Sequence, residues 1–244
     1  MTDLETARRW LAEAERVAVL TGAGISAESG VPIFRGPGGL WRQYRPEDLA
    51  TPGAFARDPR LVWEWYDWRR SVVAQAAPNA GHLALAELER RTKDFTLITQ
   101  NVDGLHERAG SRRVLKLHGD LWTLRCTACG AERVDRTVPL PELPPRCPCG
   151  GFLRPGVVWF GESLPVDALE QAAAAAARAQ VFLVVGTSAV VQPAASLPLL
   201  ARQAGARVVE INAEPTPLTD IADASFLGKS GELLPRLVET EVRA

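Results

Sequence analysis

The chain has 244 residues and a net charge of −1, with 46% hydrophobic and 23% charged residues, an ordinary globular composition. Its length suits one large domain, or one domain that carries a small insertion. The nearly neutral charge gives no electrostatic reason to expect direct binding of nucleic acid or of a membrane surface. No apolar run approaches the ~20 residues of a membrane span, and the charged N-terminal segment does not resemble a signal peptide. We therefore expect a cytoplasmic protein without a membrane partner.

An amphipathic helix is expected first, capped by Thr2 or Asp3 and running to about Arg16. Short apolar runs then indicate buried parallel strands, with helical patterns between several of them. The expected strands are 17–20, 95–99, 114–117, 181–185 and 208–211, and the expected helices are 82–90, 166–178 and 193–203. This order predicts an α/β fold with a Rossmann-like, doubly wound parallel sheet.

Two segments interrupt the alternation of strands and helices. Residues 35–78 are rich in Trp and have no strand signal, and residues 125–153 carry all four cysteines around a Pro-rich middle. We expect these segments to form a smaller domain, made of a helical module and a zinc module. The Rossmann-like domain would then consist of residues 1–34, 79–124 and 154–244.

A glycine motif directly follows the first expected strand. Gly22, Gly24 and Ala27 fit the G-x-G-x-x-G/A pattern, which allows a tight turn and close approach of a pyrophosphate to a helix N-terminus. An ordinary glycine-rich turn is the alternative. The acidic residue that binds the ribose in dehydrogenases would be Glu47 or Asp48, but both lie in the strandless segment. A hydride-transferring dehydrogenase is therefore disfavoured, and a dinucleotide must be held differently.

The four cysteines form two closely spaced pairs. Cys126-x-x-Cys129 is followed after 17 residues by Cys147-x-Cys149, one residue shorter than the usual second pair. Four thiolates in this pattern predict one structural zinc, closed by protein ligands and with no position left for catalysis. Free thiols are the alternative. Clustering in one segment argues against the scattered disulfides of a secreted fold.

Polar residues follow two neighbouring strands. Asn101 and Asp103 come after the second expected strand, and His118 comes after the third. Because ligands bind at the C-terminal ends of parallel strands, these residues are candidates for a catalytic site. The pKa of an unperturbed histidine, near ~6.5, suits His118 to general-base catalysis. Asn101 or Asp103 could instead be a helix N-cap, and local or structural roles are favoured for His82 and His106.

Seven motifs resemble the sirtuin family and occur in sirtuin order over nearly the whole chain. They are residues 22–26, 30–35, 99–103, 118–120, the cysteine pairs, 158–162 and 186–188. The resemblance implies an enzyme that consumes NAD as a co-substrate while it removes acyl groups from lysine side chains of proteins. NAD and the acyl-lysine peptide would meet in the cleft between the two domains.

The resemblance also implies site residues. The pyrophosphate, ribose and nicotinamide end of NAD would contact Gly22, Ala23, Gly24, Phe34, Arg35, Gln100, Asn101 and Asp103, and the adenosine half would contact Gly186, Thr187, Ser188, Asn212, Glu214 and Ser230. Segment 158–162 would pair as a strand with the substrate backbone, through Val158, Phe160, Gly161 and Glu162.

In the implied reaction, the acyl carbonyl oxygen attacks the anomeric carbon of the nicotinamide ribose, and nicotinamide leaves. His118 acts as general base on a ribose hydroxyl, with Asn101 and Asp103 beside it in the catalytic site. The products are free lysine, nicotinamide and O-acyl-ADP-ribose. Mono-ADP-ribosyl transfer is one alternative. A non-catalytic NAD- or zinc-binding module is another, although mere binding has no need of a base.

Tyr66 and Arg69 are three residues apart in an expected helix and therefore share one face. In the sirtuins that accept succinyl-, malonyl- and glutaryl-lysine, such a pair meets the distal carboxylate, which a planar guanidinium can grip with two hydrogen bonds. The alternative is an aromatic-rich amphipathic helix with Arg69 at the surface. We predict a desuccinylase and demalonylase that also removes acetyl groups.

Overall fold

The computed structural model describes residues 3–36 and 38–239. Its larger body is a six-stranded parallel sheet with the order β3-β2-β1-β7-β8-β9. The strands are β1 (Arg16–Thr21), β2 (Asp94–Thr99), β3 (Val114–Lys116), β7 (Val181–Val185), β8 (Arg207–Asn212) and β9 (Ala224–Leu227). The strand order reverses between β1 and β7. Ligands of such sheets bind at this switch point, beside the C-terminal strand ends.

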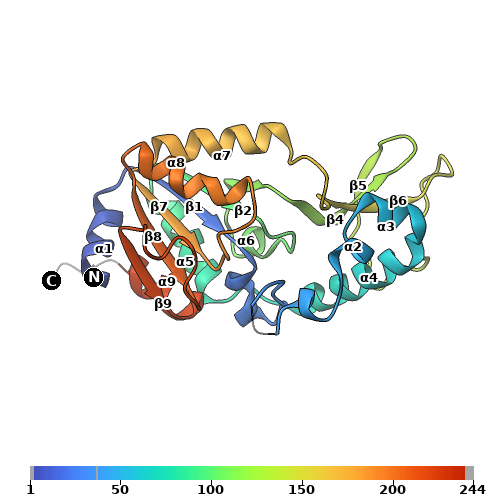
Figure 1. The fold of residues 1–244 in the computed structure, drawn as a ribbon, viewed down its shortest axis with the longest axis horizontal. Coiled ribbons are helices and arrows are strands. Elements are labelled where there is room, and N and C mark those ends of the chain that lie inside the picture. The colour runs from blue at the N-terminus through green and yellow to red at the C-terminus, as the bar shows by residue number, and fades with distance from the viewer. Residues whose placement is uncertain (1–2, 37, 240–244) are drawn as a thin grey trace.

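Helices cover both faces of this sheet (Figure 1). One face carries α1 (Leu4–Glu13), α5 (Ala80–Arg91) and α9 (Ser230–Val238), and the other carries α7 (Val166–Arg178) and α8 (Leu197–Gln203). Alternate residues of β1 enter the two cores: Val17 and Val19 pack toward α1 and α5, whereas Ala18 and Leu20 pack toward α7 and α8. The expected fold class is confirmed.

The expected strands and the helices 82–90 and 166–178 are present with small shifts at their ends. The first helix is shorter than expected, because it ends at Glu13 and Arg16 already pairs with Asp94 in β1. Asp3 is its N-cap and accepts a hydrogen bond from Thr6 N at 2.8 Å, while Thr2 lies outside the described residues. The helix expected over 193–203 is split into the 3₁₀ turn η3 (Ala194–Ser196) and α8.

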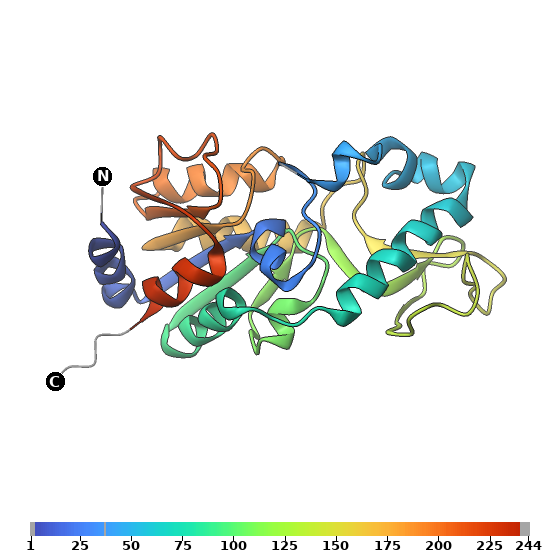
Figure 2. The same cartoon turned by 90° about the horizontal axis from the view of Figure 1, so that it is seen from below.

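A smaller body lies at the opposite end of the long axis from α1, in the views of Figure 1 and Figure 2. Its helical part holds η2 (Leu40–Arg42), α2 (Pro46–Leu49), α3 (Pro52–Arg57) and α4 (Pro59–Gln75). Its antiparallel sheet has the order β5-β4-β6, with β4 (Gly119–Cys126), β5 (Glu132–Val134) and β6 (Leu153–Val157). The expected domain boundary at 124/125 falls within β4, and the one at 153/154 falls within β6. A separate aromatic core joins the helices to this sheet.

Segment 158–162 lies outside the strands of the structure, since β6 ends at Val157, and its expected pairing with a substrate backbone stays a prediction. Val158 N donates to His118 O at 2.9 Å, and the chain then turns, with Glu162 N donating to Trp159 O at 3.0 Å. Gly161 has a φ of +87°, which favours glycine and is incompatible with a strand. Within residues 3–36 and 38–239, no helix has the length and apolar character needed to cross a membrane.

Candidate active site

The two loops at the switch point pack directly on each other. The glycine loop (residues 21–27) begins at the last residue of β1 and includes most of the 3₁₀ helix η1 (Ala23–Ser29). The β7 loop (residues 186–190) follows β7. Gly24 N donates to Gly186 O at 2.7 Å. A Cβ atom would lie 2.7 Å from Thr187 Cβ if added at Gly22, and 2.7 Å from Gly186 Cα if added at Gly24. Both glycines are therefore required by loop packing, whatever ligand the loops bind.

Asn101 and Asp103 are tied to the glycine loop through Ser26. Asn101 Nδ2 donates to Gly22 O at 3.0 Å and to Ser26 Oγ at 3.2 Å, and Ser26 Oγ donates to Asp103 Oδ2 at 2.9 Å. Asp103 Oδ1 accepts from Leu105 N at 2.8 Å, at the start of α6 (Leu105–Arg108). Burial raises the pKa of Asp103. The N-cap of α6 is Gly104, so neither Asn101 nor Asp103 is the N-cap, and Asp103 contacts both the helix start and the glycine loop.

Two buried histidines contact the glycine loop at Ser26 and Thr21. His82 Nδ1 accepts from Asn79 N at 3.3 Å, the local contact expected for it, and its Nε2 lies 3.3 Å from Ser26 Oγ. His106 Nε2 lies 2.9 Å from Thr21 Oγ1, and the two imidazole rings are 4.9 Å apart. Burial lowers the pKa of His82 to about 4 and the pKa of His106 well below its usual value, so both rings are neutral. Sequence reasoning missed Ser26 and Thr21, whose roles depend on these long-range contacts.

His118 is held in the form that a general base requires. Its Nδ1–H donates to Gln100 O at 3.0 Å, which leaves the Nε2 lone pair available to accept a proton. Burial lowers the pKa of His118, the charge of Arg35 lowers it further, and the Gln100 carbonyl partly opposes them. The Gln100 side chain donates to Thr187 Oγ1 at 2.9 Å, so the ends of β2 and β7 are linked across the switch point.

The other candidate NAD residues lie along neighbouring strand ends. Asn212 closes β8, and its Nδ2 donates to the carbonyl of exposed Glu214 at 2.8 Å. Ser188 is half-buried in the β7 loop. Ser230 is buried at the first turn of α9, against Gly81 of α5. The structure therefore brings the glycine loop, the β2 end and the β7 loop together, with Asn212 and Glu214 at the end of the next strand.

Arg69 is surrounded by the aromatic cage formed by Phe34, Trp65 and Tyr66. Its guanidinium carbon lies 4.8 Å from the ring centroid of Phe34, 4.9 Å from that of Trp65 and 5.6 Å from that of Tyr66. Only 9% of Arg69 is exposed, so the surface alternative is wrong. Burial lowers the pKa of Arg69, but a guanidinium remains charged. Within the described parts of the chain, no hydrogen bond or ion pair joins Arg69 to an anion.

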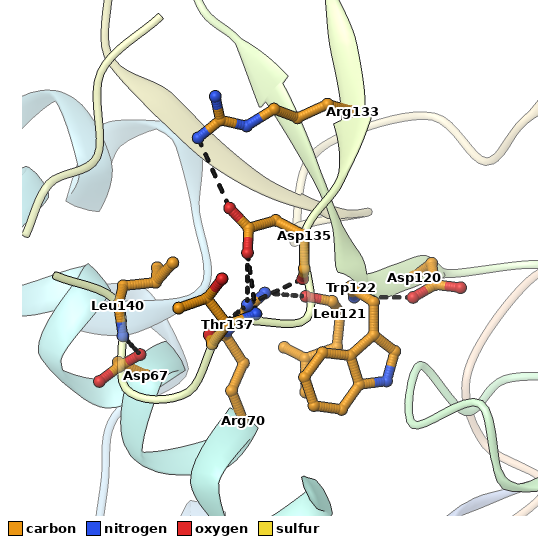
Figure 3. A network of polar contacts seen from close by, with 9 residues as sticks. All are labelled: Asp67, Arg70, Asp120, Leu121, Trp122, Arg133, Asp135, Thr137 and Leu140. Carbon is orange, nitrogen blue, oxygen red and sulfur yellow. Dashed lines mark hydrogen bonds and ion pairs between the residues drawn. The ribbon is translucent and has the colours of Figure 1, made fainter. Parts of the chain in front are cut away.

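The next residue of α4, Arg70, has a structural environment (Figure 3). It is fully buried, and its guanidinium donates at 2.8 to 3.0 Å to three carbonyls, those of Leu121, Asp135 and Thr137. The same guanidinium lies 5.0 Å from the ring of Trp122, whose Nε1 donates to Asp103 O at 2.9 Å. Arg70 thus joins α4 to β4 and to the cysteine segment, and it packs against Trp122, which in turn contacts Asp103. Sequence reasoning did not find this residue.

The four cysteines converge as expected for a zinc site. The Sγ atoms of Cys126, Cys129, Cys147 and Cys149 all lie within 4.8 Å of one another. Separations of 3.5 Å and 3.8 Å between the closest sulfur pairs exclude disulfides. The amides of Cys129 and Ala128 point at Cys126 Sγ and lower the pKa of this thiol, which favours the thiolate that a metal requires. This donor set fits a tetrahedral structural zinc. Cys126 ends the strand that begins beside His118, so the cluster lies at the opposite end of β4 from the base.

The candidate substrate segment is braced by an internal ion pair. Both carboxylate oxygens of Glu162 accept hydrogen bonds from buried Arg154, and Glu162 Oε2 also accepts from Trp159 N at 2.8 Å. Phe160 N donates to Ala50 O at 2.9 Å, and 43% of Phe160 remains exposed. Glu162 therefore shapes the turn. A cavity of about 530 Å³ beside β4 and β6 is also lined by Val158 and Glu162 but by none of the candidate NAD residues.

Comparison with known proteins agrees with this arrangement. The model of the Sir2 family matches residues 22–193. An NAD-dependent protein deacylase of Aquifex aeolicus is 58% identical over 91% of this chain and 94% of the relative. A solved Sir2 homologue in complex with NAD has a TM-score of 0.91 at 55% identity, covering 98% of this chain and 93% of its own. A Sir2–p53 peptide–NAD⁺ complex has a TM-score of 0.85 at 34% identity, covering 97% of both chains. The chain therefore belongs to the Sir2 family and is an NAD-dependent protein deacylase.

Proposed function

We propose that this deacylase prefers acidic acyl groups, such as succinyl and malonyl, on protein lysines, and that it also removes acetyl groups. The observation that carries the proposal is the buried guanidinium of Arg69, which forms no hydrogen bond or ion pair with a described acidic residue and feels Asp103 only at longer range. A buried, unpaired charge is costly, and a bound carboxylate would offset that cost. Tyr66 lies one turn away in the same helix and offers a hydroxyl to the same group.

We further propose the NAD contacts named from the sequence. The glycine loop and the β7 loop would hold the pyrophosphate and adenosine parts at the switch point, and Gln100, Asn101 and Asp103 would face the nicotinamide end. NAD supplies the ribose carbon that receives the acyl oxygen. Tethering of Asn101 to the glycine loop and of Gln100 to Thr187 supports a single preorganised cleft. The four cysteines would hold zinc as a structural cross-link.

His118 is proposed to remove a proton from a ribose hydroxyl through Nε2. The carbonyl of Gln100 accepts a hydrogen bond from Nδ1–H, so the proton of the neutral ring is on Nδ1 and Nε2 is free to act as the base. The base must be neutral to act, and burial lowers its pKa. Activity should therefore persist to a lower pH than a histidine with the ordinary pKa near ~6.5 would allow.

The test compares matched acetyl- and succinyl-lysine peptides with NAD, following deacylated peptide by mass spectrometry. We expect the wild type to remove both groups, Arg69→Met to lose mainly the succinyl activity, and His118→Tyr to lose both. Removal of acetyl alone would contradict the acidic preference. Turnover of NAD with radiolabel transferred to protein, without deacylation, would indicate mono-ADP-ribosyl transfer instead.

A further inference from the structure

Trp159 makes a hydrogen bond to the hydroxyl that the proposed function assigns to acyl recognition. Its indole Nε1–H donates to Tyr66 Oη at 2.9 Å, and both side chains are buried. Trp159 lies between two residues expected to meet the peptide backbone, but its side chain points into the small domain, toward α4. The contact joins residues 93 positions apart in the sequence.

This contact determines how the phenol can donate. One side of the Tyr66 oxygen is occupied by the indole N–H, so Tyr66 accepts there and its own proton must point elsewhere. Among the residues that the structure describes, none accepts a hydrogen bond from this hydroxyl. Burial raises the pKa of Tyr66, which keeps the phenol protonated and able to donate. An accepted hydrogen bond also polarises the O–H group and strengthens it as a donor.

The indole also packs against Arg154 and Phe55. The guanidinium carbon of Arg154 lies 3.5 Å from the Trp159 ring centroid, and Arg154 is fixed by Glu162 and by Val157 O at 2.9 Å. The ring of Phe55 lies 5.4 Å away. A buried ion pair contributes little net stability, but it fixes geometry. The orientation of the indole N–H is therefore set by the same turn that forms segment 158–162.

We propose that Trp159 is a positioning residue for acyl selection, because its indole N–H directs the Tyr66 proton toward the carboxylate of an acidic acyl group. The inference rests on the proposed function and extends it. Arg69 supplies the charge, Tyr66 supplies an oriented neutral donor, and Trp159 sets that orientation. An acetyl group has no carboxylate to receive this proton, so Trp159 should affect succinyl and acetyl substrates unequally.

The test is Trp159→Phe, which keeps an aromatic ring and deletes the N–H. We expect the ratio of kcat/KM for succinyl- to acetyl-lysine peptide to fall about 3- to 10-fold, mainly through KM, as suits the loss of one oriented hydrogen bond. Both substrates are measured on one preparation, so the folded fraction cancels from the ratio. Trp63→Phe is the matched control, since Trp63 of α4 is also a buried Trp, but its Nε1 donates to Leu153 O of β6 at 2.7 Å and not to the Tyr66 hydroxyl. It should leave the ratio unchanged.

A double-mutant cycle with Tyr66→Phe separates positioning from packing. If Trp159 acts through the hydroxyl, Trp159→Phe should not change the ratio further once that hydroxyl is gone. An unchanged ratio in Trp159→Phe, or an equal fall in the Tyr66→Phe background, would overturn the inference while leaving the acidic preference intact. A wild type that never removes succinyl would overturn both.

Discussion

Arg69 and Arg70 are consecutive in α4, yet their guanidinium groups have opposite surroundings. Arg69 lies in the aromatic cage without an ion pair to a described residue, whereas Arg70 donates to three backbone carbonyls and lies 3.7 Å from an Asp135 carboxylate oxygen. Successive helical residues are rotated by ~100°, so α4 directs Arg69 to the aromatic cage and Arg70 to β4. Arg69 is the residue proposed for acyl recognition, whereas the contacts of Arg70 join α4 to β4 and to the cysteine segment.

Substitution by Met should separate these roles. Arg70→Met should lower the free energy of unfolding by about 3–5 kcal/mol, because it leaves three backbone carbonyls and the Asp135 carboxylate without their partner. Arg69→Met should change stability by no more than ~1 kcal/mol, because it removes a buried charge that makes no hydrogen bond or ion pair with a described residue. Urea unfolding of both variants provides the comparison. Equal losses of stability would show that Arg69 is also a structural residue.

Gly24→Ala should disturb the switch point more than a typical surface change. The new Cβ would lie 2.7 Å from Gly186 Cα and 2.8 Å from Gly186 O, so the glycine loop and the β7 loop must move apart. We expect KM for NAD to rise at least 10-fold, with a stability loss of about 1–3 kcal/mol. Gly53→Ala is the control, since its Cβ meets nothing closer than Thr51 Oγ1 at 3.9 Å. Equal KM values for the two variants would contradict this account.

The sequence predicts those features that depend on local pattern. Buried apolar runs located five parallel strands, and close spacing identified the cysteine pairs, which the structure brings within 4.8 Å. Segment 158–162 follows β6 and ends in a turn held by Arg154 and Glu162, so its expected pairing with a substrate backbone stays a prediction. A family motif identifies residues that meet a ligand, but a strand also needs a neighbour to pair with.

Tertiary contacts explain what the sequence could not give. Ser26 reaches Asp103 across 77 positions, and Trp159 reaches Tyr66 across 93. Arg70 is indistinguishable from Arg69 by residue type, and only its burial against β4 reveals its role. Periodicity places a residue on a face of an element, whereas these functions depend on which element packs against that face.

Removal of zinc should unfold the small domain without changing His118 or the other residues proposed for catalysis. Cys129→Ser removes one of four thiolates from a site that anchors a Pro-rich segment with few helices or strands of its own. We expect loss of bound zinc by metal analysis, a lower Tm, and loss of deacylation in parallel. His118→Tyr should lose deacylation while it retains zinc and most of its stability. Full activity in zinc-free protein would exclude a structural need for the metal.

His82 should make the protein sensitive to mild acid. Burial lowers its pKa to about 4 in the folded state, whereas the unfolded chain has the ordinary value near ~6.5. Between these values the unfolded state binds a proton that the folded state does not, so the stability is fully present above pH 6.5 and falls toward pH 4. At pH 5 this amounts to roughly 2 kcal/mol for His82, and His106 acts in the same direction. Urea unfolding at pH 7 and pH 5 should show a smaller acid loss in His82→Asn than in the wild type. An equal loss would assign the acid sensitivity to groups other than His82, since asparagine does not titrate.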